Sequence, residues 1–454
     1  MHDVVIVGAG VAGAALGAAL GGAGRRVLLV ERDLRDPKLF VGELLQPGGV
    51  GSLERLGLAG CLEGIDAQQV RGFAVVQGES GQALPYPRLR GQGSTRPAAR
   101  GFAFHHGRFV GRLRRAARET PGVELCEGTV TGLLEEAGRV VGVRYRDRAG
   151  AEHAARANLV CAVDGRHSRL RQELTGAEPV RASHAVGLLL QGVELPYPGH
   201  GTVFLTEPSP MLSYQIGPTD VRVLADVPGE LPAVRTGALA EWLRSRIAPQ
   251  LPRSLRPAFL EAVAGSTLKV MPNYFLAPKA PPRPGVVLLA DALNLRHPLT
   301  GSGMTVALND VRLLVEALEG VELTDRSALA ARLKRFYRAR RALSTTVDIL
   351  SGALYQIFCG GEPGLDGMRE AVLRYFRLGG PAVRGPMSLL SGLSPHPSRL
   401  LAHYGAVAMV GMGQSLRPEA GRGWPGAPEL RDASALALAA LRTIRPQLER
   451  ALGA

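Results

Sequence analysis

The chain has 454 residues, a formal net charge of +14 and 46% hydrophobic residues. At roughly 150 residues per domain, this length allows two or three domains and a large apolar core, which excludes a disordered chain and a small disulfide-stapled scaffold. Arginine supplies nearly all of the positive charge, and such an excess suits either an anionic partner or an ordinary solvated surface.

The first 31 residues have the pattern of a strand, a glycine turn, a helix and a second strand. These segments are 4–7, 8–13, 14–23 and 26–30. In such a unit Gly8 permits the tight turn, Gly10 lets a pyrophosphate approach the backbone, and Gly13 lets helix and strand pack closely. Glu31 follows 18 positions after Gly13, where a carboxylate can bind ribose hydroxyls. These features predict dinucleotide binding without separating NAD from FAD.

Further along the chain, alternating or continuous apolar runs predict more strands. The clearest are 70–77, 140–145, 184–190 and 221–227, whereas 239–247 and 306–318 have helical patterns. From about residue 329 onward the pattern is mostly helical with Gly and Pro breaks, and it ends in an amphipathic helix.

Two later segments favour FAD. Residues 159–165 run from a strand into a turn at Asp164, although this segment alone is equally consistent with a hairpin. A buried strand at 286–289 then delivers Asp291, and a glycine-rich turn opens a helix at about Thr305. Asp291 can hold the ribityl hydroxyls of a flavin, and the free N–H groups of the helix start favour negative charge on reduced flavin. A fold that uses only NAD has no obvious need for this second site.

Four strings in the chain resemble the squalene monooxygenase (squalene epoxidase) family of FAD-dependent enzymes. They are VGELLQPGG at 41–49, HHGRF at 105–109, MP at 271–272 and RHPLTG at 296–301, with weaker similarity through 375–380 and 393–395 to about residue 403. The resemblance implies an α/β fold with a Rossmann-like FAD-binding domain of the aromatic-hydroxylase type, an inserted substrate-binding sheet and a helical C-terminal region.

We expect three parts of the chain to follow this plan. The FAD-binding domain is discontinuous and comprises 1–68, 100–182 and 280–340. The substrate-binding sheet domain comprises 69–99 and 183–279, and a helical cap comprises 341–454.

Matched position by position, the glycine motif and the resemblance assign residues to a cofactor and to a substrate. The cofactor residues are Gly8, Gly10, Val11, Ala12, Gly13, Glu31, Arg32, Arg114, Val130, Asp291 and Met304. The substrate residues are Phe73, Tyr214, Pro298, Leu299, Phe358, Phe376, Pro386, Leu389 and His403. An Arg114 guanidinium suits a pyrophosphate. For Phe358 and Phe376, ordinary core packing in a helical region is the alternative.

The resemblance implies epoxidation of squalene to (S)-2,3-epoxysqualene in sterol or triterpenoid biosynthesis, through a flavin 4a-hydroperoxide. The implied co-substrates are dioxygen and NADPH, the latter acting through a reductase. An alkene needs an electrophilic oxygen more than a general base, so no conventional acid/base set is expected, and Asp164, Gln46 and Phe73 are the catalytic candidates. His105, His106 and His297 are acid/base candidates or structural hydrogen-bonding residues.

Three positions depart from the family pattern. Leu39 stands where the family usually has an arginine at the flavin, and Ala290 replaces the usual glycine before Asp291. Phe73 stands where the animal and fungal enzymes carry a tyrosine, which removes a hydroxyl that can bond to Gln46.

Other function classes stay open at this stage. One is a flavin monooxygenase or prenyl reductase that acts on another polyprenyl or aromatic substrate, and another is a non-enzymatic basic membrane-binding protein. Nucleic acid is not expected, since no basic cluster is interleaved with aromatic residues. The four cysteines are scattered without metal-ligand spacing, which predicts no metal site and fits a reducing cytoplasm.

A membrane-surface location is also expected. No signal peptide is recognisable after Met1, and the apolar stretch 400–412 is shorter than the roughly 20 residues that span a bilayer. With Arg399 and Arg417 at its ends, this stretch resembles an interfacial anchor, and a buried core helix is the alternative. The predicted location is the cytoplasmic side of a membrane, peripheral or monotopic.

Overall fold

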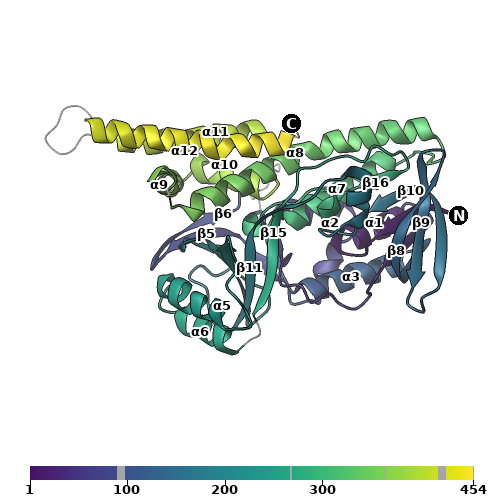
Figure 1. Ribbon diagram of the computed structural model, residues 1–454, viewed down its shortest axis with the longest axis horizontal. Coiled ribbons are helices and arrows are strands. Elements are labelled where there is room, and N and C mark those ends of the chain that lie inside the picture. The colour runs from purple at the N-terminus through teal and green to yellow at the C-terminus, as the bar shows by residue number, and fades with distance from the viewer. Residues whose placement is uncertain (89–97, 266–267, 362, 418–425, 453–454) are drawn as a thin grey trace.

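The computed structural model describes residues 1–88, 98–265, 268–361, 363–417 and 426–452. These residues form three sheets and a layer of C-terminal helices (Figure 1). The predicted division into domains at residues 68, 99, 182, 279 and 340 stays a prediction, and residues 89–97 of the expected sheet domain lie outside the described residues.

The first sheet carries the N-terminal strand–helix–strand unit. Its parallel strands follow the order β8 (Val123–Glu136), β2 (Val27–Glu31), β1 (His2–Val7), β10 (Glu152–Ala162) and β16 (Val286–Leu288). Strand β9 (Arg139–Asp147) pairs antiparallel with β8 and β10. Helices α1 (Val11–Gly22), α3 (His106–Glu119) and α7 (Gly303–Leu318) pack together against this sheet. Because its central strands are covered on both faces, they are continuous apolar runs, as the sequence predicted.

The second sheet has seven strands. Their order is β15 (Lys269–Phe275), β11 (Val180–Gln191), β14 (Asp220–Pro228), β13 (Met211–Gln215), β12 (His200–Phe204), β5 (Gly72–Gln77) and β6 (Ser80–Pro85). Side chains alternate between its faces, so Val76 packs towards α5 (Ala238–Trp242) and α6 (Arg256–Gly265), while Phe73 and Val75 pack towards the C-terminal helices. The strands predicted at 70–77, 184–190 and 221–227 are confirmed. The predicted helix at 239–247 is α5 continued by a π-helical turn, Leu243–Ile247.

Smaller elements connect these sheets. A three-stranded sheet has the order β3 (Leu44–Leu45), β7 (Gly101–Ala103) and β4 (Gln68–Val70). Helix α2 (Pro47–Arg55) follows β3 directly and packs on α7, and α4 (Arg169–Thr175) follows the turn after β10. These short elements bring the 41–49 string next to the start of α7.

The C-terminal region is helical, as predicted. It comprises α8 (Arg326–Cys359), α9 (Pro363–Arg377), α10 (Pro381–Leu390), α11 (Pro397–Ser415) and α12 (Ala427–Leu452). Figure 1 shows α11 and α12 side by side above α9, α10 and the β5–β6 hairpin. In the described part of the chain, α8 alone is long and apolar enough to cross a membrane, and 67% of its apolar window is buried inside the protein. Such burial is typical of a core helix, whose apolar side chains pack against the rest of the protein.

Candidate active site

A cavity of about 610 Å³ lies at the carboxyl ends of β1, β2 and β10. Open parallel sheets bind ligands at this edge. Nine of the eleven predicted cofactor residues line the cavity: Gly8, Gly10, Val11, Ala12, Glu31, Arg32, Val130, Asp291 and Met304. Asp164 lines it too, whereas Gly13 and Arg114 do not. The fold therefore gathers most of the predicted cofactor residues at one cavity. Their assignment to a cofactor stays a prediction.

The three positions of the turn favour glycine for different physical reasons. Gly8 has φ +100°, and a Cβ there would lie 2.7 Å from the Val163 oxygen; a Cβ on Gly13 would lie 1.8 Å from the Gly8 oxygen. A Cβ on Gly10 meets no atom within 4 Å. Packing thus requires Gly8 and Gly13, while Gly10 exposes bare backbone to the cavity. This cradle fits a group that approaches the backbone closely, such as a pyrophosphate.

Two partly buried carboxyl groups face the same cavity. Burial raises the pKa of Asp164, and one of its oxygens is buried without a hydrogen-bond partner in the described protein. Burial also raises the pKa of Asp291, although Arg296 and Arg166 oppose the shift. Acceptors in this situation suit a ligand rich in hydroxyl donors. The residues present therefore fit the ribityl and ribose groups of FAD.

Arg114 is bonded to the protein instead of facing the cavity. Its Nε donates to the Ala9 oxygen at 2.8 Å, its Nη1 donates to the Arg35 oxygen at 3.0 Å, and its Nη2 lies 3.7 Å from Glu31 Oε2. The same Glu31 oxygen accepts the Ala9 N–H at 2.7 Å. Arg114 and Glu31 thus hold the glycine turn. The predicted contact of Arg114 with a pyrophosphate stays a prediction.

The departures at positions 39 and 290 both lie at this cavity. Leu39 lines it as a partly exposed, uncharged side chain. Ala290 has φ +54°, the left-handed region that favours glycine, and its N–H donates to Asp310 at 3.2 Å. Arg340 bonds both oxygens of Asp310 at 3.0 Å. This buried ion pair holds the strained backbone that presents Asp291.

Replacing Ala290 with glycine is expected to raise the free energy of unfolding of the apoprotein by about 1 kcal/mol, because an L-residue pays roughly this much in the left-handed region. Denaturant unfolding of apoprotein measures the change. Ala292→Gly is the matched control: Ala292 is buried two residues away without a positive φ, so this variant should lose stability. Equal losses in both variants would contradict the strain at Ala290.

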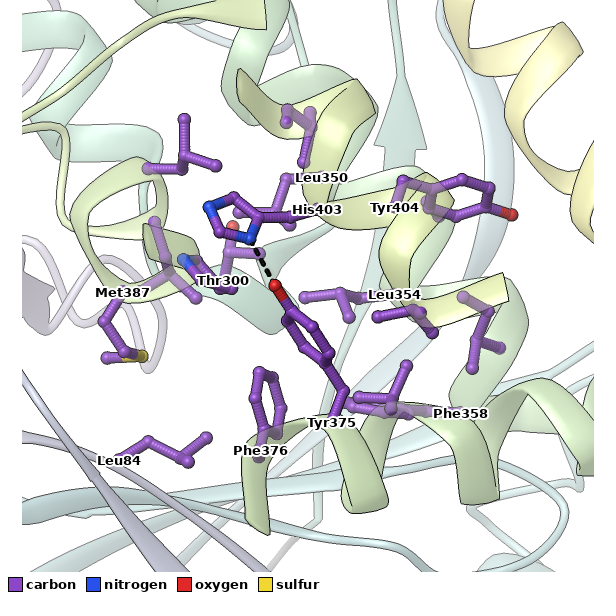
Figure 2. A pocket seen from close by; sticks show the side chains of 18 of the residues that line it. Leu84, Thr300, Leu350, Leu354, Phe358, Tyr375, Phe376, Met387, His403 and Tyr404 are labelled. Atoms are coloured by element: carbon purple, nitrogen blue, oxygen red, sulfur yellow. Dashed lines mark hydrogen bonds between the residues drawn. The ribbon is translucent and has the colours of Figure 1, made fainter. Parts of the chain in front are cut away.

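A second cavity lies between the seven-stranded sheet and helices α8 to α11, and its lining is almost entirely apolar (Figure 2). Seven of the nine predicted substrate residues line it: Phe73, Leu299, Phe358, Phe376, Pro386, Leu389 and His403. Tyr214 and Pro298 line the first cavity instead. Phe358 and Phe376 are therefore placed at a cavity, which ordinary core packing does not require.

Sequence reasoning missed most of the α8 wall of this cavity. It consists of Ile349, Leu350, Ala353, Leu354, Ile357 and Phe358. Their spacing of one, four, five, eight and nine positions marks one face of a helix, a signal that the sequence carried. Val75 and Val203 were also missed, although the two-residue alternation of β5 and β12 puts them on the face of Phe73.

Figure 2 shows one polar pair among these apolar side chains. The Tyr375 hydroxyl and His403 Nδ1 lie 2.7 Å apart, and burial lowers the pKa of His403. A Cβ on Gly385 would lie 2.0 Å from His403 Nε2, so this glycine makes room for the ring. Since the hydroxyl and the imidazole bond to each other and the lowered pKa favours the neutral ring, the cavity suits a hydrocarbon.

One short turn separates the two cavities. In the 3₁₀ turn Pro298–Thr300, Pro298 lines the first cavity with the adjacent Gly301, while Leu299 and Thr300 line the second. His297 Nδ1 accepts the Leu299 N–H at 3.3 Å, and its Nε2 lies 3.2 Å from Asp226 Oδ1. His297 therefore fixes this turn and lines neither cavity. The arrangement can place one end of an apolar chain beside a bound cofactor.

The other candidate histidines are also bonded to the protein. His105 Nε2 lies 2.8 Å from Asp220, and His106 Nδ1 lies 2.8 Å from the Gly42 oxygen. His106 lines the first cavity, and burial lowers its pKa, which favours the neutral ring. These contacts are those of structural hydrogen-bonding residues.

Gln46 contacts the turn directly, although it lines neither cavity. Its Nε2 donates to the Thr300 oxygen at 2.8 Å, and its Oε1 accepts a hydrogen bond from the Tyr86 hydroxyl. Phe73 packs edge-on against Tyr86, with ring centroids 6.4 Å apart. A hydroxyl is therefore supplied to Gln46 from Tyr86, even though position 73 lacks one.

Known structures share this architecture. A flavoprotein/dehydrogenase from Cytophaga hutchinsonii matches with a TM-score of 0.70 at 18% identity, over 91% of this chain and 100% of that one. The FAD-dependent halogenase CndH matches with a TM-score of 0.64 at 21% identity, over 92% and 98% of the two chains. These likenesses confirm the predicted α/β fold.

Sequence comparisons identify the family. Residues 156–427 match the squalene epoxidase family. Squalene epoxidase 3 of Arabidopsis thaliana is 44% identical over 439 residues, which are 96% of this chain and 83% of that protein. Squalene monooxygenase of Mus musculus is 43% identical over 412 residues, 90% and 71% of the two chains. The chain therefore belongs to the squalene epoxidase family.

Proposed function

We propose that this chain is an FAD-dependent monooxygenase that converts squalene to (S)-2,3-epoxysqualene. The observation that carries the proposal is the turn Pro298–Thr300, which forms part of both the dinucleotide cavity and the apolar cavity. Family membership supports the same substrate, because the related proteins are named squalene epoxidases and monooxygenases. Squalene has only carbon and hydrogen, and the second cavity offers it an apolar lining.

FAD would be held by residues of the first cavity. The bare backbone at Gly10 would receive the pyrophosphate, Glu31 the adenosine ribose and Asp291 the ribityl chain. When bound and reduced, FAD supplies the activated oxygen that the alkene receives. The protein's own part is to orient the terminal double bond at the Pro298–Thr300 turn and to exclude water with the apolar walls.

The electron balance requires a two-electron donor. Squalene, dioxygen, NADPH and a proton give the epoxide, water and NADP⁺. We propose that NADPH acts through a separate reductase, as the resemblance implied.

The test is product analysis with purified protein, FAD, NADPH, a diflavin reductase and dioxygen. Squalene should give the 2,3-epoxide, and omission of the reductase should stop the reaction. A polar-substrate hydroxylase would instead oxidise NADPH directly when an aromatic substrate is added, and a prenyl reductase would give saturated products. Absence of epoxide across several reductases and detergents would overturn the proposal.

We also propose that the protein acts at the cytoplasmic surface of a membrane, where squalene dissolves. Exposed apolar side chains on the last two helices support this location. They are Leu401 and Met409 on α11, Leu416 directly after it, and Leu430, Leu438 and Leu441 on α12. Exposed arginines, Arg431 and Arg442, lie on α12 as well. An apolar face with adjacent cations is typical of interfacial helices.

Replacing Leu438 and Leu441 together with glutamate should release the protein from anionic liposomes in a flotation assay at physiological salt. The reason is the loss of two apolar side chains that would enter the lipid and the addition of two negative charges that lipid phosphates repel. The matched control replaces two other exposed leucines, Leu189 on β11 and Leu260 on α6, and should float like the original protein. Failure of the original protein to float would contradict the location.

A further inference from the structure

Tyr86 is a buried tyrosine that follows β6 at the edge of the seven-stranded sheet. Its side chain is 4% exposed, and its hydroxyl bonds to Gln46 Oε1. Burial raises the pKa of Tyr86 well above 10, so the hydroxyl keeps its proton throughout the physiological range. Tyr86 lines neither cavity, and the residues assigned to the site from the sequence do not include it.

Gln46 connects this tyrosine to the turn between the cavities. It is fully buried at the N-cap of α2, its backbone N–H donates to Thr305 Oγ1 at 3.2 Å, and its Nε2 donates to the Thr300 oxygen at 2.8 Å. A carbonyl oxygen only accepts hydrogen bonds, so the amide nitrogen must face Thr300 and the amide oxygen must face Tyr86. The Tyr86 hydroxyl must therefore donate to the amide oxygen, and this bond holds the amide in the orientation that the Thr300 oxygen requires.

We propose that Tyr86 is a positioning residue for the epoxidation. Through Gln46 it holds the Thr300 carbonyl, and thereby the wall between the cofactor and the alkene. The inference rests on the proposed function. The Thr300 oxygen also accepts the Ser302 hydroxyl at 3.1 Å, so loss of Tyr86 should loosen the turn without collapsing it.

A misplaced wall has a specific chemical consequence. When the alkene is not held at the reacting oxygen, dioxygen and NADPH with a proton give hydrogen peroxide and NADP⁺, and squalene is left unchanged. The ratio of epoxide formed to NADPH consumed therefore reports how well the alkene is positioned. A loss of stability alone does not change this ratio. Small displacements are sufficient, because a misplacement of about 1 Å can cost on the order of 100-fold in rate.

The test compares Tyr86→Phe with the original holoenzyme and its reductase. The variant keeps the ring and its contact with Phe73 but leaves the Gln46 oxygen without its donor. We expect the epoxide-to-NADPH ratio to fall about tenfold, with hydrogen peroxide accounting for the difference, and the KM for squalene to change less than about twofold.

The matched control is Tyr337→Phe. Tyr337 is a partly buried tyrosine on α8 whose hydroxyl bonds to the backbone of Leu288, away from both cavities. The Tyr337→Phe variant should lose stability and keep the original epoxide-to-NADPH ratio. An unchanged ratio in Tyr86→Phe, or an equal fall in Tyr337→Phe, overturns the proposal. If the original enzyme forms no epoxide, the proposed function fails instead, so the two failures are distinguishable.

If Tyr86→Phe does not fold, Gln46→Glu tests whether the bond to the Thr300 oxygen positions the alkene. A glutamate side chain can still accept from Tyr86, but it can donate to the Thr300 oxygen only when protonated. Its epoxide-to-NADPH ratio should therefore rise as the pH is lowered, whereas the ratio of the original enzyme should not. A ratio independent of pH would overturn the proposal.

Discussion

Replacing Gly10 with alanine is expected to lower FAD affinity at least about tenfold and to leave the stability of the apoprotein nearly unchanged. The added Cβ meets no atom within 4 Å in the structure, and Gly10 has φ −74°, which alanine adopts freely. The methyl group would instead occupy the space that a pyrophosphate needs, and about 1.4 kcal/mol of lost binding is tenfold in affinity. Flavin fluorescence titration gives the affinity, and denaturant unfolding gives the stability.

Gly13→Ala separates the two reasons for glycine in this turn. Its Cβ would lie 1.8 Å from the Gly8 oxygen, so the variant apoprotein should be destabilised by about 1–3 kcal/mol or fail to fold. Retention of FAD by Gly10→Ala at the original affinity would mean that the pyrophosphate does not lie against this backbone. The first cavity would then have lost its assignment to FAD.

Replacing Ala353 with phenylalanine is expected to reduce kcat/KM for squalene more than about tenfold without loss of FAD. Ala353 lies on the α8 wall of the apolar cavity and away from the first cavity. The phenyl ring would occupy space that the hydrocarbon needs. Displacing only two substrate CH₂ groups forfeits about 1.6 kcal/mol, which exceeds a tenfold effect. Steady-state epoxide formation measures the change, and the flavin content shows that the fold is intact.

Ala339→Phe is the control for helix α8. Ala339 lies on the exposed side of the same helix, so the same substitution there should leave squalene turnover unchanged. Equal activity of Ala353→Phe and the original enzyme would show that the polyprene does not use the apolar cavity. The proposal that Phe73, Phe358 and Phe376 bind substrate would fail with it.

Local patterns predicted much of this fold. The β1–α1–β2 unit and the strands β5, β11 and β14 follow from apolar periodicity, because each buries the face that its period specifies. The family strings predicted residues that the structure gathers at two cavities.

Other features depended on packing that no local pattern encodes. Arg114 lies on α3, where it bonds the glycine turn more than 100 positions earlier. Tyr214 lines the first cavity from β13, and Pro298 lines it because the Pro298–Thr300 turn forms part of both cavities. Tyr86 became recognisable only when its bond to Gln46 was seen, since position 73 had been expected to decide that contact.

The origin of the oxygen atom in the epoxide distinguishes a flavin-dependent monooxygenase from other enzymes that act on squalene. Purified protein with FAD, NADPH, reductase and squalene is supplied with ¹⁸O₂ in ordinary water, and the product is analysed by mass spectrometry. We expect 2,3-epoxysqualene that carries one ¹⁸O atom, with the second oxygen atom recovered in water. No epoxide, or an epoxide whose oxygen comes from water, would contradict the proposed function.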